Sequence, residues 1–122
     1  DWVLKDRDEV TGKIFSPEEL SLPHNMPTAF VCNCDLSASV LIKRLEEDGY
    51  RVPDDISVVG YDNYLYPGLC DVEITTYEVD IKEMAKRATS RIVKKISNEK
   101  YKKGMSIVEG RLVIKDSVKK IG

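Results

Sequence analysis

Three side chains in the middle of the chain have the chemistry to hold a small polar ligand. Asp35 follows an apolar run over residues 28–33. Tyr61 and Asp62 follow a second apolar run, over residues 56–60. An ionised carboxylate only accepts hydrogen bonds, and its two oxygens suit adjacent hydroxyl groups such as those of a sugar. A tyrosine can stack on a ligand ring or donate its hydroxyl. These residues therefore predict a binding site for a hydroxyl-rich molecule.

The two aspartates also have purely structural alternatives. Asp is a common helix N-cap, so Asp35 could simply cap the helix that follows it, and local pattern alone favours that role. Asp62 and Asn63 could likewise open an Asx-type turn, which the local sequence also favours. Both alternatives remain open from the sequence alone.

The two apolar runs and the segment between them form one predicted strand–helix–strand unit. Neither run alternates with polar residues, which is typical of strands covered on both faces. The segment between them carries apolar residues in helical register, and Gly49 followed by Pro53 ends that helix. The helical apolar residues are Leu36, Val40, Leu41 and Leu45. Parallel strands joined by a helix end at the same edge of the sheet, where ligands bind in open α/β folds. The predicted fold class is therefore α/β, with a parallel sheet and flanking helices.

The rest of the chain carries fewer chemical signals. Residues 1–26 are a polar, irregular lead-in with one helix-capping signature at residues 16–19. Residues 72–79 predict an extended segment, and Asp80 and Glu83 form a capping box for a long helix. The apolar stripe of that helix consists of Ile81, Met84, Ala85, Ala88, Ile92 and Ile96, and core packing explains such a stripe more often than a partner-binding face does. Residues 104–109 and 111–114 predict two further extended pieces.

Length and charge limit the functional classes. The chain has 122 residues, 42% of them hydrophobic, which suits one domain or part of one; it begins at Asp1, so we expect a longer parent protein. No apolar run is long enough to span a membrane, and no signal-peptide pattern opens the sequence. Residues 1–81 hold 6 basic and 17 acidic residues, a net charge of −11, whereas residues 82–122 hold 13 and 4, a net charge of +9. A solvated helix face explains the basic residues better than a DNA-binding surface, because no aromatic platform or recognition helix accompanies them.

Catalytic and metal-dependent functions find little support. The single histidine, His24, lies in a polar loop, so no nucleophile–histidine pair is predicted. The sequence contains neither a G-x-G-x-x-G motif nor a phosphate-binding loop. Cys32 and Cys34 have no histidine nearby and lie at an unfavourable spacing for a disulfide, so we expect them to be small buried apolar side chains. The odd number of cysteines favours a reducing compartment, and we expect a cytoplasmic protein without cofactor or metal.

From Pro27 onward the sequence resembles the effector-binding domain of the lac-repressor/galactose-repressor family, which is built like the periplasmic sugar-binding proteins. The matching pieces, in chain order, are PTAFVCNCDLSA, EEDGYRVPDDISVVGYDN, ITTYEVDIKEMAKRA and GRLVIKDSV. They cover most of residues 27–118, and RVPDDISVVGYDN is the most specific of them. The chain departs from the family pattern at Cys34, where Asn is usual, and at Ser37, where Met is common. These departures concern the identity of the ligand more than the fold.

The resemblance implies the C-terminal part of a two-lobed, ligand-sensing domain in a bacterial transcriptional regulator. It implies that Asp35 binds ligand hydroxyls and that Tyr61 and Asp62 lie at the cleft or hinge. It also implies that Thr75 and Thr76 belong to a crossover between the lobes. DNA would be bound only through an N-terminal domain that this chain lacks, and no membrane is implied.

The long helix, over residues 78–98, would belong to the other lobe, so its apolar stripe would lack a partner within residues 27–122. Burying such a side chain is worth about 1.5–3 kcal/mol. We therefore expect the helix to be swapped with a second copy, in a homodimer, or to fold back. An extracytoplasmic sugar-binding protein of a transport system is the alternative function with the same fold. An α/β enzyme fragment is a third class, against which the near absence of histidine argues.

Overall fold

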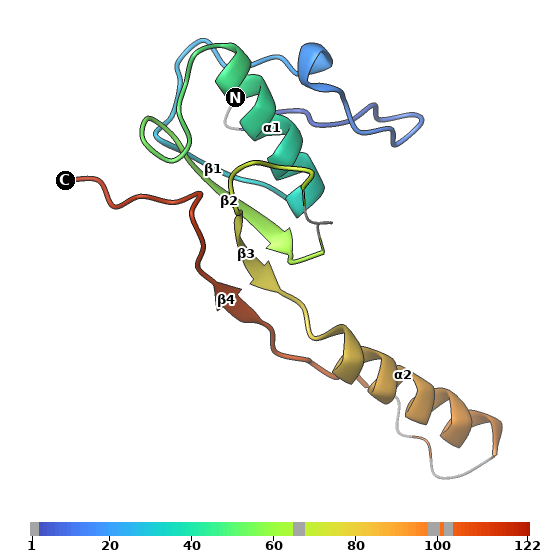
Figure 1. The fold of residues 1–122 in the computed structure, drawn as a ribbon. Helices are drawn as coiled ribbons and strands as arrows, with labels where there is room; N and C mark the ends of the chain where they lie inside the picture. Colours follow the sequence, from blue (N-terminus) through green and yellow to red (C-terminus); the bar gives the residue numbers. More distant parts are fainter. Residues whose placement is uncertain (1–2, 65–67, 98–100, 102–103) are drawn as a thin grey trace. The chain divides into compact units, whose positions relative to one another are not determined.

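The computed structural model describes residues 3–64, 68–97, 101 and 104–122 (Figure 1). The chain forms two compact units, one made of Asp1–Glu78 with Leu112–Gly122 and the other of Val79–Arg111. It therefore passes between the units twice, after residue 78 and after residue 111. The first unit contains the predicted strand–helix–strand unit and all of the predicted ligand and crossover residues.

The strand–helix–strand prediction is confirmed. It consists of β1 (Ala29–Val31), α1 (Asp35–Glu47) and β2 (Ser57–Asp62). β1 and β2 pair in parallel, with Ala29 beside Ser57 and Val31 beside Val59. Gly49 follows α1 with φ +89°, a left-handed conformation that ends helices and favours glycine. Because the strands are parallel, their carboxyl ends lie at one edge of the sheet, beside the start of α1.

Two further strands extend the sheet in the order β1-β2-β3-β4. β3 (Thr75–Glu78) pairs in parallel with β2, so that Asp62 lies beside Glu78. β4 (Arg111–Val113) follows β3 in the sheet. The extended segments predicted over residues 72–79 and 111–114 thus contain strands. Residues 104–109 form no strand, so only the second of the two predicted extended pieces near the C-terminus belongs to the sheet.

Ser117 fastens β2 to β3 near their amino-terminal ends. Its hydroxyl donates a hydrogen bond to the carbonyl of Val58 at 2.5 Å and accepts one from the amide of Thr75 at 2.8 Å. Its own carbonyl accepts from the Val58 amide at 2.8 Å. Ser117 is completely buried, so these bonds are shielded from water. One side chain therefore satisfies backbone groups of two strands.

The hydrophobic core lies between α1 and one face of the sheet. α1 contributes a buried face, β2 and its neighbours contribute the facing residues, and the lead-in contributes one leucine. These residues are Leu20, Ala38, Leu41, Ile42, Leu45, Val52, Ile56, Val58 and Ile74. The predicted helix face is therefore partly wrong, because Ile42 is in the core while Leu36 is 45% exposed. Leu36 belongs to the first turn of α1, beyond the edge of the core.

Within the described residues, the other face of the sheet is not covered. Val31 is 84% exposed, and the rings of Tyr61 and Tyr77 are also exposed on that face. The expectation that both faces of these strands are buried is therefore not met. Parallel sheets usually carry a layer on each face, and here α1 provides one layer only.

The polar lead-in is packed onto the first unit. It contains the short 3₁₀-helix η1 (Pro17–Glu19), whose predicted capping is confirmed because Glu19 Oε2 accepts from the Ser16 amide at 2.8 Å. Leu20, directly after η1, is buried in the core. Asp6 accepts a hydrogen bond from the hydroxyl of Ser37 on α1 at 2.6 Å. The lead-in therefore helps to build the unit that holds the predicted site.

The second unit consists mainly of α2 (Ile81–Ile96), and none of its residues is buried. The Asp80 carboxylate caps α2 by accepting from the Glu83 amide at 2.9 Å, which is one half of the predicted capping box. The Glu83 carboxylate instead accepts from Arg87 Nε at 2.7 Å. Arg87 and Arg91 donate to the carbonyls of Ile107 and Gly104, both at 2.9 Å, and so hold the irregular segment 104–109 against the helix. Neither α2 nor any other described helix is long and apolar enough to cross a bilayer.

Candidate functional site

Asp35 is not the cap of α1, so the structural alternative considered for it is wrong. The N-cap is Cys34, whose Sγ accepts a hydrogen bond from the Ser37 amide at 3.4 Å. Asp35 is the first residue inside the helix. Its side chain therefore does not cap the helix. Instead it points toward β2 at the carboxyl edge of the sheet, where it contacts Gly60.

The Asp35 carboxylate is buried and incompletely satisfied. The residue is 2% exposed, and its Oδ1 atom has no hydrogen-bond partner among the described residues. Burial raises the pKa of the Asp35 carboxyl, and the nearby Asp62 charge adds to the rise. Hydrogen bonding by the Thr76 side chain and the Tyr61 backbone, and the charge of Lys115, oppose it. An unpaired buried oxygen is costly unless something binds it, so this atom is a candidate ligand contact, which a ligand reaches only when its surroundings move because the atom has almost no accessible surface.

Gly60 makes room for that carboxylate. A Cβ atom built on Gly60 would lie 2.0 Å from Asp35 Oδ1 and 3.1 Å from both Asp35 Cγ and Ile74 Cγ2. No L-residue with a side chain fits this position unless Asp35 moves. The sequence analysis did not single out Gly60, although a glycine inside a buried strand is a known sign of a close approach.

Asp62 ends β2 in a strained conformation. Its φ is +92° and that of Asn63 is +55°, both in the left-handed region. Asp62 Oδ1 accepts a hydrogen bond from the Tyr64 amide at 2.9 Å, which confirms the predicted Asx-type turn. Its charge also contributes to the raised pKa of Asp35, so the two carboxylates are electrostatically coupled. The structural role and a ligand role are compatible, because the turn uses only one oxygen.

The structure does not bring the Tyr61 ring to Asp35. Successive side chains of a strand point to opposite faces, and Gly60 is the residue that faces Asp35. The Tyr61 ring lies on the other face, where it stacks on Tyr77 with ring centroids 5.8 Å apart and an interplanar angle of 14°. Only the backbone of Tyr61 takes part in the Asp35 environment.

The predicted crossover residues Thr75 and Thr76 are both buried in β3. Thr75 accepts a hydrogen bond from the Lys115 amide at 2.9 Å. Thr76 Oγ1 accepts from the Asn63 amide at 3.3 Å, and the Thr76 side chain opposes the rise in the pKa of Asp35. Thr76 therefore connects the buried carboxylate to the turn that ends β2.

Two polar residues at this edge, Glu78 and Lys115, were not predicted, and Asn63 was predicted only as part of a turn. Asn63 Nδ2 donates to Glu78 Oε2 at 2.6 Å, and Lys115 Nζ donates to Asn63 Oδ1 at 3.0 Å. Each partner is more than a dozen residues from Asn63 along the chain, so no local pattern could have paired them. They surround the predicted site with an amide, a carboxylate and an ammonium group.

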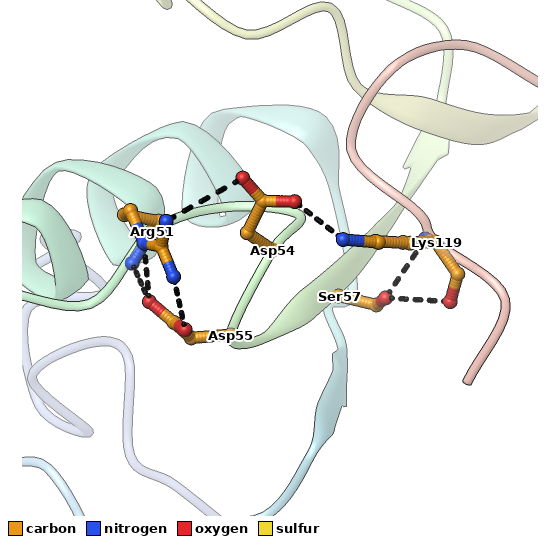
Figure 2. A network of polar contacts seen from close by, with 5 residues as sticks. All are labelled: Arg51, Asp54, Asp55, Ser57 and Lys119. Atoms are coloured by element: carbon orange, nitrogen blue, oxygen red, sulfur yellow. Dashed lines mark hydrogen bonds and ion pairs between the residues drawn. The ribbon is translucent and has the colours of Figure 1, made fainter. Parts of the chain in front are cut away.

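The acidic pair Asp54–Asp55 has a structural role at the opposite end of β2 (Figure 2). Arg51 donates to both oxygens of Asp55 at 3.0 Å, and Lys119 Nζ contacts Asp54 Oδ1 at 2.6 Å. The Lys119 amide also donates to Ser57 Oγ at 3.1 Å, which ties the C-terminal segment to the start of β2 (Figure 2). These pairs are exposed and contribute little stability each. They account for the two carboxylates without a ligand.

The cysteines fit structural roles. Cys32 packs against the core, and burial raises the pKa of its thiol to about 12. Cys34 is the helix cap described above rather than a simple apolar residue, which modifies the prediction made for it. All three cysteines are free thiols.

Taken together, the carboxyl edge of the sheet offers one buried carboxylate with a vacant acceptor atom and a second, partly exposed carboxylate beside it. Such a pair can accept hydrogen bonds from ligand hydroxyl or amine groups.

Comparison with known proteins identifies similar domains. A family model of the periplasmic binding protein-like domain matches residues 4–118. The HTH-type transcriptional repressor PurR of Vibrio campbellii is 30% identical over 121 residues, which are 99% of this chain and 36% of the repressor. The chain therefore spans about a third of the length of this relative.

Two of the solved structures that are similar to the chain are regulators of transcription. One is a LacI family transcriptional regulator from Arthrobacter sp. FB24 in complex with lactose, with 26% identity, a TM-score of 0.65, and coverage of 75% of this chain and 35% of that one. The other is the lac repressor dimer bound to operator and the anti-inducer ONPF, with 27% identity, a TM-score of 0.68, and coverage of 75% and 32%.

Proposed function

The chain belongs to the periplasmic binding protein-like domain family, and from that membership we propose that it is the C-terminal part of the effector-binding domain of a lac-repressor-type transcriptional regulator. The similar proteins named above are transcriptional regulators, which favours this function over a transport protein with the same fold and over an enzyme. A regulator of transcription works where the DNA is, so we assign the protein to the cytoplasm. DNA is bound through a separate N-terminal domain of the parent protein.

The effector is a small molecule with adjacent hydroxyl groups, most simply a sugar. The observation that carries this proposal is the buried Asp35 carboxylate, whose Oδ1 atom lacks a partner among the described residues. Asp35 is the main hydroxyl acceptor, and Asp62 is the second one at the same edge. The complex of a similar regulator with lactose supports a sugar as the ligand class.

Tyr61, Thr75 and Thr76 have supporting roles in this proposal. Thr76 orients Asp35, because its side chain stabilises the charged form of that carboxylate. Thr75 anchors the returning chain through its bond from the Lys115 amide, as a crossover residue should. Tyr61 contributes its backbone to the ligand edge, and its ring stacks on Tyr77 on the other face of the sheet.

The regulator acts as a homodimer in which α2 is covered by another lobe, its own or one exchanged with a second copy. The support is the apolar stripe of α2, since Ile81, Met84, Ile92 and Ile96 are all exposed. Leaving these side chains in water forfeits about 1.5–3 kcal/mol each. Size-exclusion chromatography with light scattering tests the proposal on the chain itself. A concentration-independent monomer would contradict an exchanged helix.

Isothermal titration calorimetry on the intact regulator tests the role of Asp35, with sucrose and lactose as probes. A hydrogen bond to a charged group contributes about 1.5–3 kcal/mol, so Asp35→Ala should weaken binding about ten- to a hundredfold. Asp54→Ala is the matched control, because it removes an aspartate at the opposite end of the strand. Equal affinities of the Asp35→Ala variant and the wild type would remove Asp35 from the site. Failure of both sugars to bind the wild type would exclude them as effectors.

A further inference from the structure

The side chain of Asn63 joins two segments that are far apart in the sequence. Its Nδ2 donates to Glu78 Oε2 at 2.6 Å, and its Oδ1 accepts from Lys115 Nζ at 3.0 Å. Its backbone amide donates to Thr76 Oγ1 at 3.3 Å. The side-chain amide of Asn63 thus donates to a carboxylate and accepts from an ammonium group. Hydrogen bonds to charged groups are stronger than those between neutral groups.

The two partners of Asn63 stand where the chain leaves and re-enters the first unit. Glu78 is the last residue before the chain enters Val79–Arg111, and Lys115 follows closely after the return at Leu112. Asn63 itself leaves β2 with φ +55°, a conformation that Asn adopts more readily than most residues. Its place and its conformation both serve to present the amide to the two connecting segments.

We propose that Asn63 is a positioning residue that latches both connecting segments to the carboxyl end of β2. Only a side chain with a donor and an acceptor close together can hold a carboxylate and an ammonium group at once. The latch fixes the spacing of the two segments at the point where they leave the first unit. This property belongs to the ligand-free protein and goes beyond the proposed sensing function, because it requires no effector.

Hydrogen–deuterium exchange of the whole chain, resolved by NMR, tests the latch. Asn63→Ala is expected to raise amide exchange rates about tenfold or more in residues 76–80 and also in residues 111–116, since a charge-assisted bond to each segment is lost. Asn25→Ala, the same change in an exposed loop, should leave both segments unchanged. Faster exchange in only one segment, or in neither, would overturn the proposal.

Exchanging the amide and the carboxylate between positions 63 and 78 distinguishes loss of the latch from general loss of structure. Asn63→Asp places a carboxylate against Glu78 and should free residues 76–80, while Lys115 still has its acceptor. Glu78→Gln alone replaces the charged acceptor of Asn63 by a neutral one and should speed exchange in residues 76–80 less than Asn63→Asp does. In the double variant N63D/E78Q, the new amide at position 78 can donate to the new carboxylate, so slow exchange should return. An additive double variant, without this rescue, would refute the latch even if Asn63→Ala fails to fold.

Discussion

The contact between Gly60 and Asp35 gives the sharpest test of how the site is built. A Cβ atom at position 60 would lie 2.0 Å from Asp35 Oδ1, far inside van der Waals contact, so Gly60→Ala must displace the carboxylate. Forcing an extra carbon into a well-packed region costs about 1–3 kcal/mol. Against a total stability of about 5–15 kcal/mol for a typical domain, that is a large fraction.

A double-mutant cycle isolates this contact from every other effect of the methyl group. In an Asp35→Ala background the carboxylate is absent, so Gly60→Ala should lower the free energy of unfolding much less. The only tight contact that remains is the one of 3.1 Å between the new Cβ and Ile74 Cγ2. We expect a coupling free energy of about 1–3 kcal/mol, the range for residues in direct contact. Urea unfolding followed by circular dichroism gives the four free energies of unfolding. Gly104→Ala is the matched control, because nothing lies within 4 Å of a Cβ at that position. The same cost for Gly60→Ala in both backgrounds would refute the reasoning.

Two further predictions concern stability. Ser117→Ala leaves the Val58 carbonyl and the Thr75 amide without their side-chain partner, and each buried unsatisfied group costs about 1–3 kcal/mol; urea unfolding should therefore show a loss of about 2–5 kcal/mol, and a loss no larger than that of the exposed Ser106→Ala would contradict the role of Ser117. A hydrogen bond from Arg7 holds the pKa of the Asp6 carboxyl well below its usual range. The ionised Asp6 carboxylate therefore contributes fully to the stability of the fold above pH about 4, and this contribution is lost as the pH falls below that value. Asp6→Asn should consequently flatten the acid side of the stability–pH curve, and identical slopes below pH 4 would exclude this contribution.

The elements of the first unit were predictable because local patterns specify them. The two apolar runs, the helical register between them and Gly49 give the strand–helix–strand unit and its parallel pairing. The edge on which Asp35 and Asp62 lie follows from that topology alone. Neither the spacing nor the resemblance to a family predicted the order of the remaining strands in the sheet.

The chemistry of Asp35 was less predictable, because a neighbouring side chain decides it. The local pattern favoured Asp35 as the helix cap, but the thiol of Cys34 occupies that position. Cysteine is not among the usual capping residues, so the local pattern did not predict this cap. Gly60 carried a usable signal, since glycine in a buried strand often marks a close contact.

Contacts between distant segments could not be predicted from the sequence. Asn63, Lys115 and Ser117 act through partners many residues away, and their types alone suggest surface polar residues. The exposed face of the sheet was mispredicted for a related reason. The apolar content of a strand indicates that a covering layer is needed, but it does not say which segment provides it.

The most direct test of the account is the pKa of Asp35, measured by NMR from the titration of its side-chain carboxyl carbon in the ligand-free chain. Burial with a vacant oxygen should raise the pKa above the ordinary value for aspartate, about 3.9. The charged form is then penalised by folding, so the stability contributed at this position falls as the pH rises through the raised pKa. A pKa at or below the ordinary value would mean that the carboxylate is solvated or paired, and would contradict its assignment as the vacant acceptor of the site.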